Sequence, residues 1–169
     1  DILDETDKAL VEDIRKAKEK VEHLIEEFKF RDALYEVIDL SRKGNKYMQE
    51  KEPWIKAKQL AENPLAQKNI DNCLHLCLQL TANLAILINP FLPTTAKKML
   101  GMMKLVDKVL DWEHAGKIKL LSVGYSLREP QLLFRKIEDE EISAQVQKLK
   151  NGQAPPPPKG GISDSPMHK

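Results

Sequence analysis

Apolar side chains recur every three or four positions along the first fifty residues, a spacing that places them on one face of an α-helix. The first stripe consists of Leu10, Ile14, Ala17, Val21, Leu24 and Phe28. Its phase breaks near Lys29, because a continued stripe would put Arg31 and Asp32 on the apolar face. The second stripe consists of Phe30, Ala33, Leu34, Val37, Ile38, Ser41, Asn45 and Met48. The pattern predicts two long helices, one over residues 6–28 and one from residue 30 onward, packed antiparallel.

A third and more apolar stripe predicts a central helix. Pro53 ends or kinks the second helix, and a short helical segment follows over residues 55–60. Asn63 and Pro64 then form a helix start, since Asn caps well and Pro suits the first helical position. The stripe that follows is Ile70, Cys73, Leu74, Cys77, Leu80, Thr81, Leu84, Leu87 and Ile88, with Leu76, Leu78 and Ile86 on other faces. A helix that is apolar on several faces is expected to have neighbours all round.

The chain after this helix is broken again by proline and glycine. Residues 89–93 (Asn-Pro-Phe-Leu-Pro) end the central helix, and Thr94 or Thr95 is expected to cap a helix that runs to residue 106. Residues 116–133 lack helical periodicity and are interrupted by glycine and proline. Within them, the apolar stretch 117–121 is expected to be extended and to wrap the bundle.

The C-terminal part of the chain predicts one more helix and a tail. Asp139 is expected to cap a helix over residues 140–150, with acids in its first turn and lysines in its last, as the helix dipole favours. Residues 151–169 contain four consecutive prolines and several glycines, and we expect a disordered linker. The predicted fold is all-α: an antiparallel bundle of four or five helices with an extended crossing segment over residues 1–150.

Composition excludes several classes of protein. Seven glycines in 169 residues argue against a glycine-rich phosphate loop and a turn-rich β fold, and a net charge of +1 argues against a globally basic nucleic-acid coat. No apolar run approaches the roughly 18 residues that span a bilayer. Two cysteines without a disulfide framework suit a reducing compartment, so we expect a cytoplasmic protein. A start at Asp1 without methionine suggests a processed or excised beginning.

No residue set predicts catalysis or a metal site. The four histidines are scattered, and His75 points away from the helix face that Cys73 and Cys77 share. Two buried thiols that act as small apolar groups are the favoured interpretation of these cysteines. Acidic pairs such as Glu26 and Glu27 fit a solvated helix face, and neither a serine nor a cysteine lies in a nucleophile motif. We therefore expect no catalytic residue, metal or cofactor in this chain.

The distribution of charge is more informative. Residues 1–27 carry ten acidic against five basic residues, whereas residues 41–60 carry six basic against two acidic residues. The basic stretch also contains Tyr47 and Trp54, close to the proline that interrupts the helix. Basic side chains neutralise phosphates, and an aromatic ring at a helix end offers a face on which an unpaired base can stack. A solvated helix with Trp54 in the core explains the same pattern, and the pattern alone favours that alternative.

A family resemblance changes this balance. Residues 45–54 (Asn-Lys-Tyr-Met-Gln-Glu-Lys-Glu-Pro-Trp) resemble the Asn-x-Tyr to Pro-Trp motif in the anticodon-binding helical bundle of methionyl-tRNA synthetases. Further matches in the same order are residues 30–34, residues 89–93, Trp112, the 116–124 crossing and the Leu-Phe segment at residues 133–139. The resemblance covers residues 5–150 and implies an anticodon-binding bundle of the class I synthetase type.

The resemblance also implies roles for individual residues. Trp54 would stack on the wobble-position cytosine of the CAU anticodon, and Pro53 would shape the corner that presents it. Asn45 and Tyr47 belong to the same motif, and both are expected to line the anticodon-binding surface. Asn45 serves equally well as a contact or as an internal hydrogen-bonded tie. On charge alone, candidate phosphate contacts are Arg42, Lys43, Lys46 and Lys56. The implied partners are methionine-specific tRNA and the catalytic domain of the same chain, without membrane or DNA.

This sequence also departs from the family pattern. The His-x-Gly-His and Lys-Met-Ser-Lys-Ser motifs of the catalytic domain do not occur, so we expect a non-catalytic fragment of an ATP-dependent methionine–tRNA ligase. ATP, with zinc as a further candidate, would belong to the catalytic part. The family's first anticodon helix, which supplies an Asn and an Arg, is expected before Asp1. Residues 155–169 resemble a linker that leads, in some members, to a tRNA-binding β-barrel.

Two alternatives stay open from the sequence. One is the related bundle of another class I synthetase, and the other is a helical scaffold for protein–protein contacts. The scaffold predicts a buried Trp54 and an exposed apolar patch, whereas RNA binding predicts that Trp54 is at least partly exposed among lysines.

Overall fold

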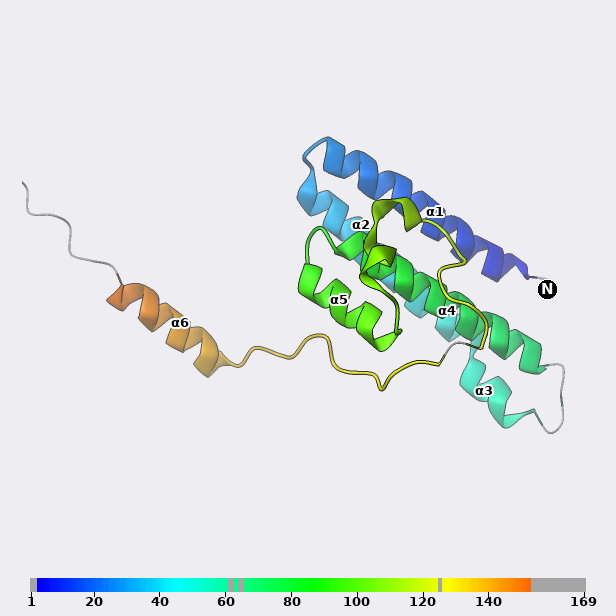
Figure 1. Ribbon diagram of the computed structural model, residues 1–169. Coiled ribbons are helices and arrows are strands. Elements are labelled where there is room, and N and C mark those ends of the chain that lie inside the picture. The colour runs from blue at the N-terminus through cyan, green and yellow to red at the C-terminus, as the bar shows by residue number, and fades with distance from the viewer. Residues whose placement is uncertain (1–2, 61–62, 64–65, 125, 153–169) are drawn as a thin grey trace, which may run out of the picture. The chain divides into compact units, whose positions relative to one another are not determined.

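All regular secondary structure in the described part of the chain is helical. A computed structural model describes residues 3–60, 63, 66–124 and 126–152, and none of these residues forms a β-strand (Figure 1). The elements are α1 (Glu5–Glu26), α2 (Phe30–Lys51), α3 (Pro53–Lys58), α4 (Ala66–Ile88), α5 (Pro93–Met102), the 3₁₀ turns η1 (Asp107–Leu110) and η2 (Trp112–His114), and α6 (Asp139–Asn151). The all-α prediction is confirmed. The chain divides into two compact units, residues 1–133 and 134–169.

Helices α1 and α2 form the pair that the two stripes predicted. A capping box at the start of α1 joins Asp4 and Asp7, and the predicted phase break becomes the turn between the two helices. Phe28 occupies that turn with a φ of 61°, in the left-handed region. The buried residues of the pair are Leu10, Ile14, Ala17 and Val21 on α1, with Ala33, Val37, Leu40, Gly44 and Tyr47 on α2.

The stripe predicted for α2 is wrong at several positions, including its first residue, Phe30, which is 53% exposed. Asn45 is exposed and Ile38 is 37% exposed, whereas Leu40, Gly44 and Tyr47 are buried. The apolar stripe of α2 is wider than one contact face, and α1 and α4 cover only one edge of it. Gly44 lies where α4 comes closest, since a Cβ at this position would lie 2.2 Å from Leu80 Cδ2.

The prediction of a central helix is confirmed by α4, which contacts α1, α2, α3 and α5. Leu74 corrects the predicted stripe, because it is 46% exposed. By length and composition alone α4 could span a membrane, with a mean hydropathy of 1.2, contrary to the sequence-based expectation. Its place inside the bundle accounts for this apolar character, since it must pack against neighbours on several sides.

Two buried amides on α4 hold the crossing segment, and the sequence analysis missed both. Gln79 and Asn83 are completely buried. Gln79 accepts a hydrogen bond from Leu120 N at 2.7 Å and donates one to Leu121 O at 2.8 Å. Asn83 accepts from Gly116 N at 2.7 Å and donates to Lys117 O at 2.8 Å. The predicted wrapping segment therefore satisfies its buried backbone groups through side chains of α4 rather than through a strand partner.

The other boundary predictions need small corrections. Helix α5 begins at Pro93 after Leu92, without a side-chain cap, so neither Thr94 nor Thr95 caps it, and it ends at Met102. Proline itself occupies the first turn, where its missing N–H is not needed. The 3₁₀ turns at residues 107–114 were not predicted. Pro64, the other half of the expected start of α4, lies outside the described residues.

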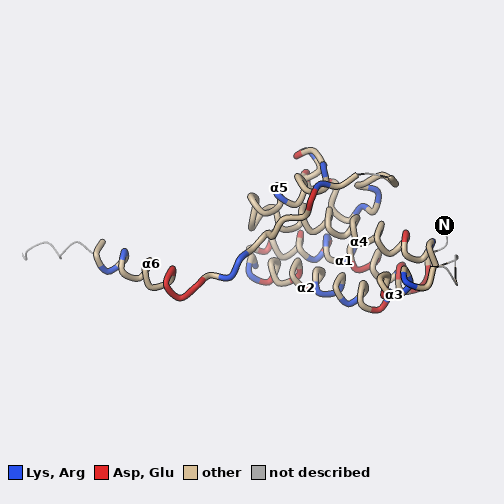
Figure 2. Tube along the Cα trace, turned by 90° about the horizontal axis from the view of Figure 1, so that it is seen from below, with Lys and Arg blue, Asp and Glu red and all other residues tan. Residues whose placement is uncertain are grey.

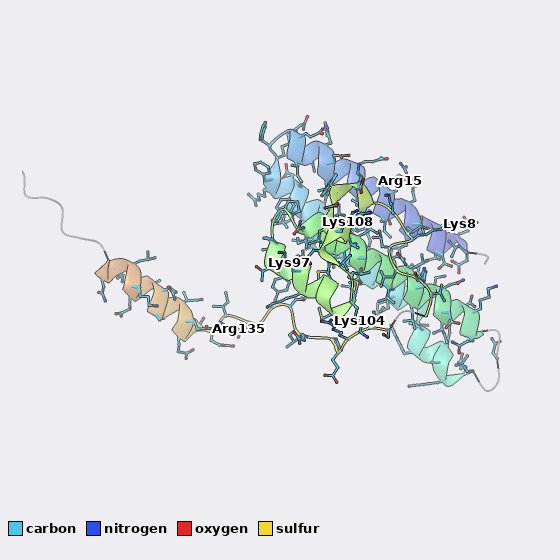
Figure 3. All side chains as sticks on the ribbon, viewed as in Figure 1. Lys8, Arg15, Lys97, Lys104, Lys108 and Arg135 are labelled. Atoms are coloured by element: carbon cyan, nitrogen blue, oxygen red, sulfur yellow. The ribbon has the colours of Figure 1, made fainter. Side chains whose placement is uncertain are left out.

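The second unit contains α6. Its cap is Glu138 rather than Asp139, and Glu141 completes a reciprocal capping box. Arg135, labelled in Figure 3, donates two hydrogen bonds to the Glu141 carboxylate at 2.6 and 2.7 Å. The linker expected over residues 151–169 lies outside the described residues from residue 153 onward.

Candidate nucleic-acid interface

The corner between α2 and α3 presents Trp54. Glu52 has a φ of 46° and serves both as the C-cap of α2 and as the N-cap of α3. Pro53 lacks the N–H that would continue α2, so the chain turns at Glu52 and restarts as a helix. The Glu52 carbonyl accepts hydrogen bonds from Ile55 N at 3.0 Å and Lys56 N at 3.2 Å, which fixes the first turn of α3. Helix α3, which begins with the Pro-Trp pair, lies at one end of the bundle (Figure 1).

The two tryptophans have different surroundings. The side chain of Trp54 is 43% exposed, whereas the neighbouring Pro53 is buried. Trp112 is partly buried against the core, and its Nε1 donates a hydrogen bond to Glu22 Oε1 at 2.9 Å. Trp54 is thus partly accessible to a ligand, as an RNA-binding role requires, and that exposure disagrees with a Trp54 in the core.

The four candidate phosphate contacts differ in availability. Lys43 lies 2.9 Å from Asp13 Oδ1, and this hydrogen bond raises the pKa of Lys43. Lys46 is well exposed and lies 3.7 Å from Glu50. Within the described residues, Arg42 and Lys56 form no ion pair, and Arg42 is exposed. Figure 2 shows basic and acidic positions interleaved along α2, so the surface is a mixed one with a few unpaired cations.

Asn45 and Tyr47 lie in opposite environments. Asn45 is exposed, so it is not an internal tie, and its amide can reach a ligand. Tyr47 is 3% exposed and donates its hydroxyl to Asp7 Oδ1 at 2.8 Å. Burial, reinforced by the hydrogen bond to Asp7, raises the pKa of Tyr47 far above its usual value. The expectation that Tyr47 lines the binding surface is therefore corrected: its ring packs between helices and can act only by positioning them.

A buried ion pair lies behind the corner, and the sequence analysis missed it. Lys51 counts among the basic residues around Trp54, yet it is 7% exposed and its Nζ lies 2.6 Å from Asp7 Oδ1. Lys51 also pairs with Asp4, and this hydrogen bond lowers the pKa of the Asp4 carboxyl. The Asp4-x-x-Asp7 spacing could have predicted the capping box of α1, but the sequence does not indicate that Asp7 also pairs with Lys51.

The two thiols lie next to this pair. Cys73 is buried and Cys77 is partly buried, and both are free. The hydrogen bond between them lowers the pKa of Cys73 to about 7 and raises that of Cys77 well above its usual value. Among the described residues, no group of three or more His, Cys, Asp or Glu side chains is placed to hold a metal ion.

A family model for the anticodon-binding domain of methionyl-tRNA ligase matches residues 2–154. The chain belongs to this family. The match includes the corner and every candidate contact residue described above. It favours the methionyl family over the bundle of another class I synthetase.

Curated methionine–tRNA ligases are similar to this chain over most of its length. The Porphyromonas gingivalis ligase (strain W83) is 40% identical over 149 residues, 88% of this chain, and a Bacteroides fragilis ligase (strain YCH46) is 42% identical over 147 residues. The Pyrococcus horikoshii ligase is 37% identical over 140 residues. The chain spans only about a fifth of the length of these relatives: 21%, 20% and 18%.

The anticodon-binding fold is also found among solved structures. The free-state methionyl-tRNA synthetase of Mycobacterium tuberculosis superposes with a TM-score of 0.74 at 22% identity. The superposition covers 82% of this chain and 27% of that one. This likeness supports the helical bundle.

Proposed function

We propose that this chain reads the CAU anticodon of methionine-specific tRNA as one domain of a methionine–tRNA ligase. The observation that carries the proposal is the Trp54 corner. An indole that is 43% exposed follows a buried proline at the end of a helix, in a chain that the family model of methionyl anticodon-binding domains spans.

Recognition would combine stacking with charge. The exposed face of Trp54 would stack on the wobble cytosine, and such stacking contributes roughly 1–3 kcal/mol per base. Arg42, Lys46 and Lys56 would neutralise phosphates of the loop, because no salt bridge in the described residues engages Arg42 or Lys56 and the Lys46 pair is exposed. The exposed amide of Asn45 would offer a donor and an acceptor to a base edge.

The chemistry of the parent enzyme would lie elsewhere. This chain would hold the tRNA while a catalytic part of the same protein, which requires ATP, forms the methionyl adenylate and transfers methionine. The partners are therefore the tRNA and that catalytic part, in the cytoplasm.

The test of the proposed function is a comparison of two RNA hairpins. An anticodon stem-loop with CAU should bind more tightly than the same loop with a purine at the first anticodon position, measured by fluorescence anisotropy of labelled RNA. Equal affinity for the two loops, at every salt concentration, would leave only non-specific phosphate binding.

A further inference from the structure

The Trp54 corner is anchored from behind by one carboxylate. Asp7 is 3% exposed, and its Oδ1 accepts a hydrogen bond from the Tyr47 hydroxyl at 2.8 Å and lies 2.6 Å from Lys51 Nζ. Its Oδ2 accepts from Asp4 N at 3.1 Å, in the capping box of α1. The Asp7 side chain therefore joins the first turn of α1 to the last turn of α2. Its partner there, Lys51, lies three residues before Trp54.

Stability alone is a poor explanation for this arrangement. Removing two charges from water is costly, and a buried ion pair often contributes little more than apolar side chains of the same size would. A buried pair does, however, fix geometry, because any displacement leaves an unpaired charge in a medium of low polarity. Lys51 lies on the corner itself, since Glu52 and Pro53 follow it directly.

We propose that Asp7 and Lys51 are positioning residues for anticodon recognition: they fix the end of α2 so that Trp54 presents its face to the base. The inference rests on the proposed function and adds residues to it. It also separates Lys51 from the neighbouring basic residues that are proposed to contact phosphates, which charge alone does not do. Lys51 lies among basic residues in the sequence, but its ammonium group is turned inward and can contact no phosphate.

The test compares Lys51→Met with Lys46→Met in the 169-residue chain. Lys46 is the matched control, because it lies on the same helix, is exposed and is a proposed phosphate contact. Lys51→Met should weaken binding of the CAU stem-loop roughly three- to tenfold and reduce discrimination against the purine-first loop, since the stacking face is misplaced. Its salt dependence should equal that of the wild type. Lys46→Met should instead reduce the slope of log K against log salt by about 0.7 and leave discrimination unchanged.

Conservative variants separate positioning from folding. Lys51→Arg keeps the charge and should restore most of the affinity. If Lys51→Met loses its helical circular dichroism, Tyr47→Phe takes its place, because it removes a single hydroxyl from the same carboxylate and should lower discrimination without changing the salt slope.

Two results would overturn the inference. A folded Lys51→Met or Tyr47→Phe protein with wild-type affinity and discrimination would show that the pair is structural only, and a reduced salt slope for Lys51→Met would show a direct phosphate contact. Trp54→Ala, measured in parallel, distinguishes a failure of the positioning role from a failure of the proposed function. If Trp54→Ala weakens binding and Lys51→Met does not, only the positioning role fails. If neither variant changes binding, the proposed function fails as well.

Discussion

Trp112 donates its indole N–H to Glu22 Oε1 at 2.9 Å, and this bond joins the 3₁₀ turn η2 to α1. The Trp112 ring is partly buried against the core, whereas Trp54 is 43% exposed to solvent. Trp112→Phe should therefore cost stability, on the order of 1 kcal/mol for the lost hydrogen bond, without changing RNA affinity. Urea unfolding and stem-loop binding measure the two effects. A loss of RNA affinity in Trp112→Phe would contradict the prediction, because it would indicate that the RNA contacts Trp112 rather than Trp54.

Gln79 should be among the most sensitive positions for folding. Gln79→Leu removes the partners of Leu120 N and Leu121 O, and buried backbone groups left unpaired cost about 1–3 kcal/mol each. We expect a loss of about 2–4 kcal/mol in the free energy of unfolding, and faster hydrogen exchange over residues 117–121.

Gln67 provides the matched control for this prediction. It lies on the same helix, is exposed, and its side chain donates a hydrogen bond to Asp71 Oδ1 at 2.7 Å. Gln67→Leu should change the unfolding free energy by less than about 0.5 kcal/mol, as surface substitutions do. Equal losses at the two positions would show that Gln79 acts through helix propensity and not through its hold on the crossing segment.

The pH dependence of stability should report the Asp4 carboxyl. Its pKa is lowered in the folded protein, chiefly by the hydrogen bond from Lys51, so the folded state favours the ionised form. The resulting stability is present above the unfolded pKa of 3.8 and is lost as the pH falls through the lower folded value. Asp4→Asn should remove part of the loss seen in thermal melts below pH 4, and an unchanged acid limb would contradict this assignment.

The salt dependence of RNA binding should be moderate. Six basic residues lie in the stretch around the corner, but Lys51 is buried and Lys43 is paired with Asp13. Of the four that remain, Arg42, Lys46 and Lys56 are the proposed phosphate contacts, and Lys58 is not counted among them. For a single-stranded loop, log K should then fall with log salt at a slope of about −2. Titrations between low and physiological salt measure it. A slope near zero would favour the scaffold interpretation.

Helices α1, α2 and α4 were predictable from sequence because each buries residues of a periodic apolar stripe. Pro53 also marked the end of α2 correctly, because proline cannot continue a helix, whereas Pro93 was expected to precede α5 and instead begins it. The rotation of each helix about its own axis was not predictable. Leu74 and Ile38 lie at the edges of wide apolar stripes, and periodicity alone does not say which edge of a stripe a neighbouring helix covers.

The site was predictable only in part, for a similar reason. The family motif indicated Trp54 and Asn45, and both are exposed. It could not show that Tyr47 and Lys51 of the same segment are buried, because their partner Asp7 lies 40 and 44 positions away in sequence. Likewise, the sequence gives no reason to place a polar residue such as Gln79 in the core, because the backbone groups that it bonds lie in a distant segment of the chain.

The most direct test of the central claim is the affinity of Trp54→Ala for the CAU stem-loop, measured by anisotropy beside the wild type and Trp112→Phe. Because Trp54 is half exposed, the variant should fold as the wild type does, with unchanged circular dichroism. The account predicts that its affinity falls about tenfold or more, the loss expected when a stacked base loses its indole, while Trp112→Phe binds normally. A folded Trp54→Ala protein that binds the CAU loop as tightly as the wild type would contradict the account.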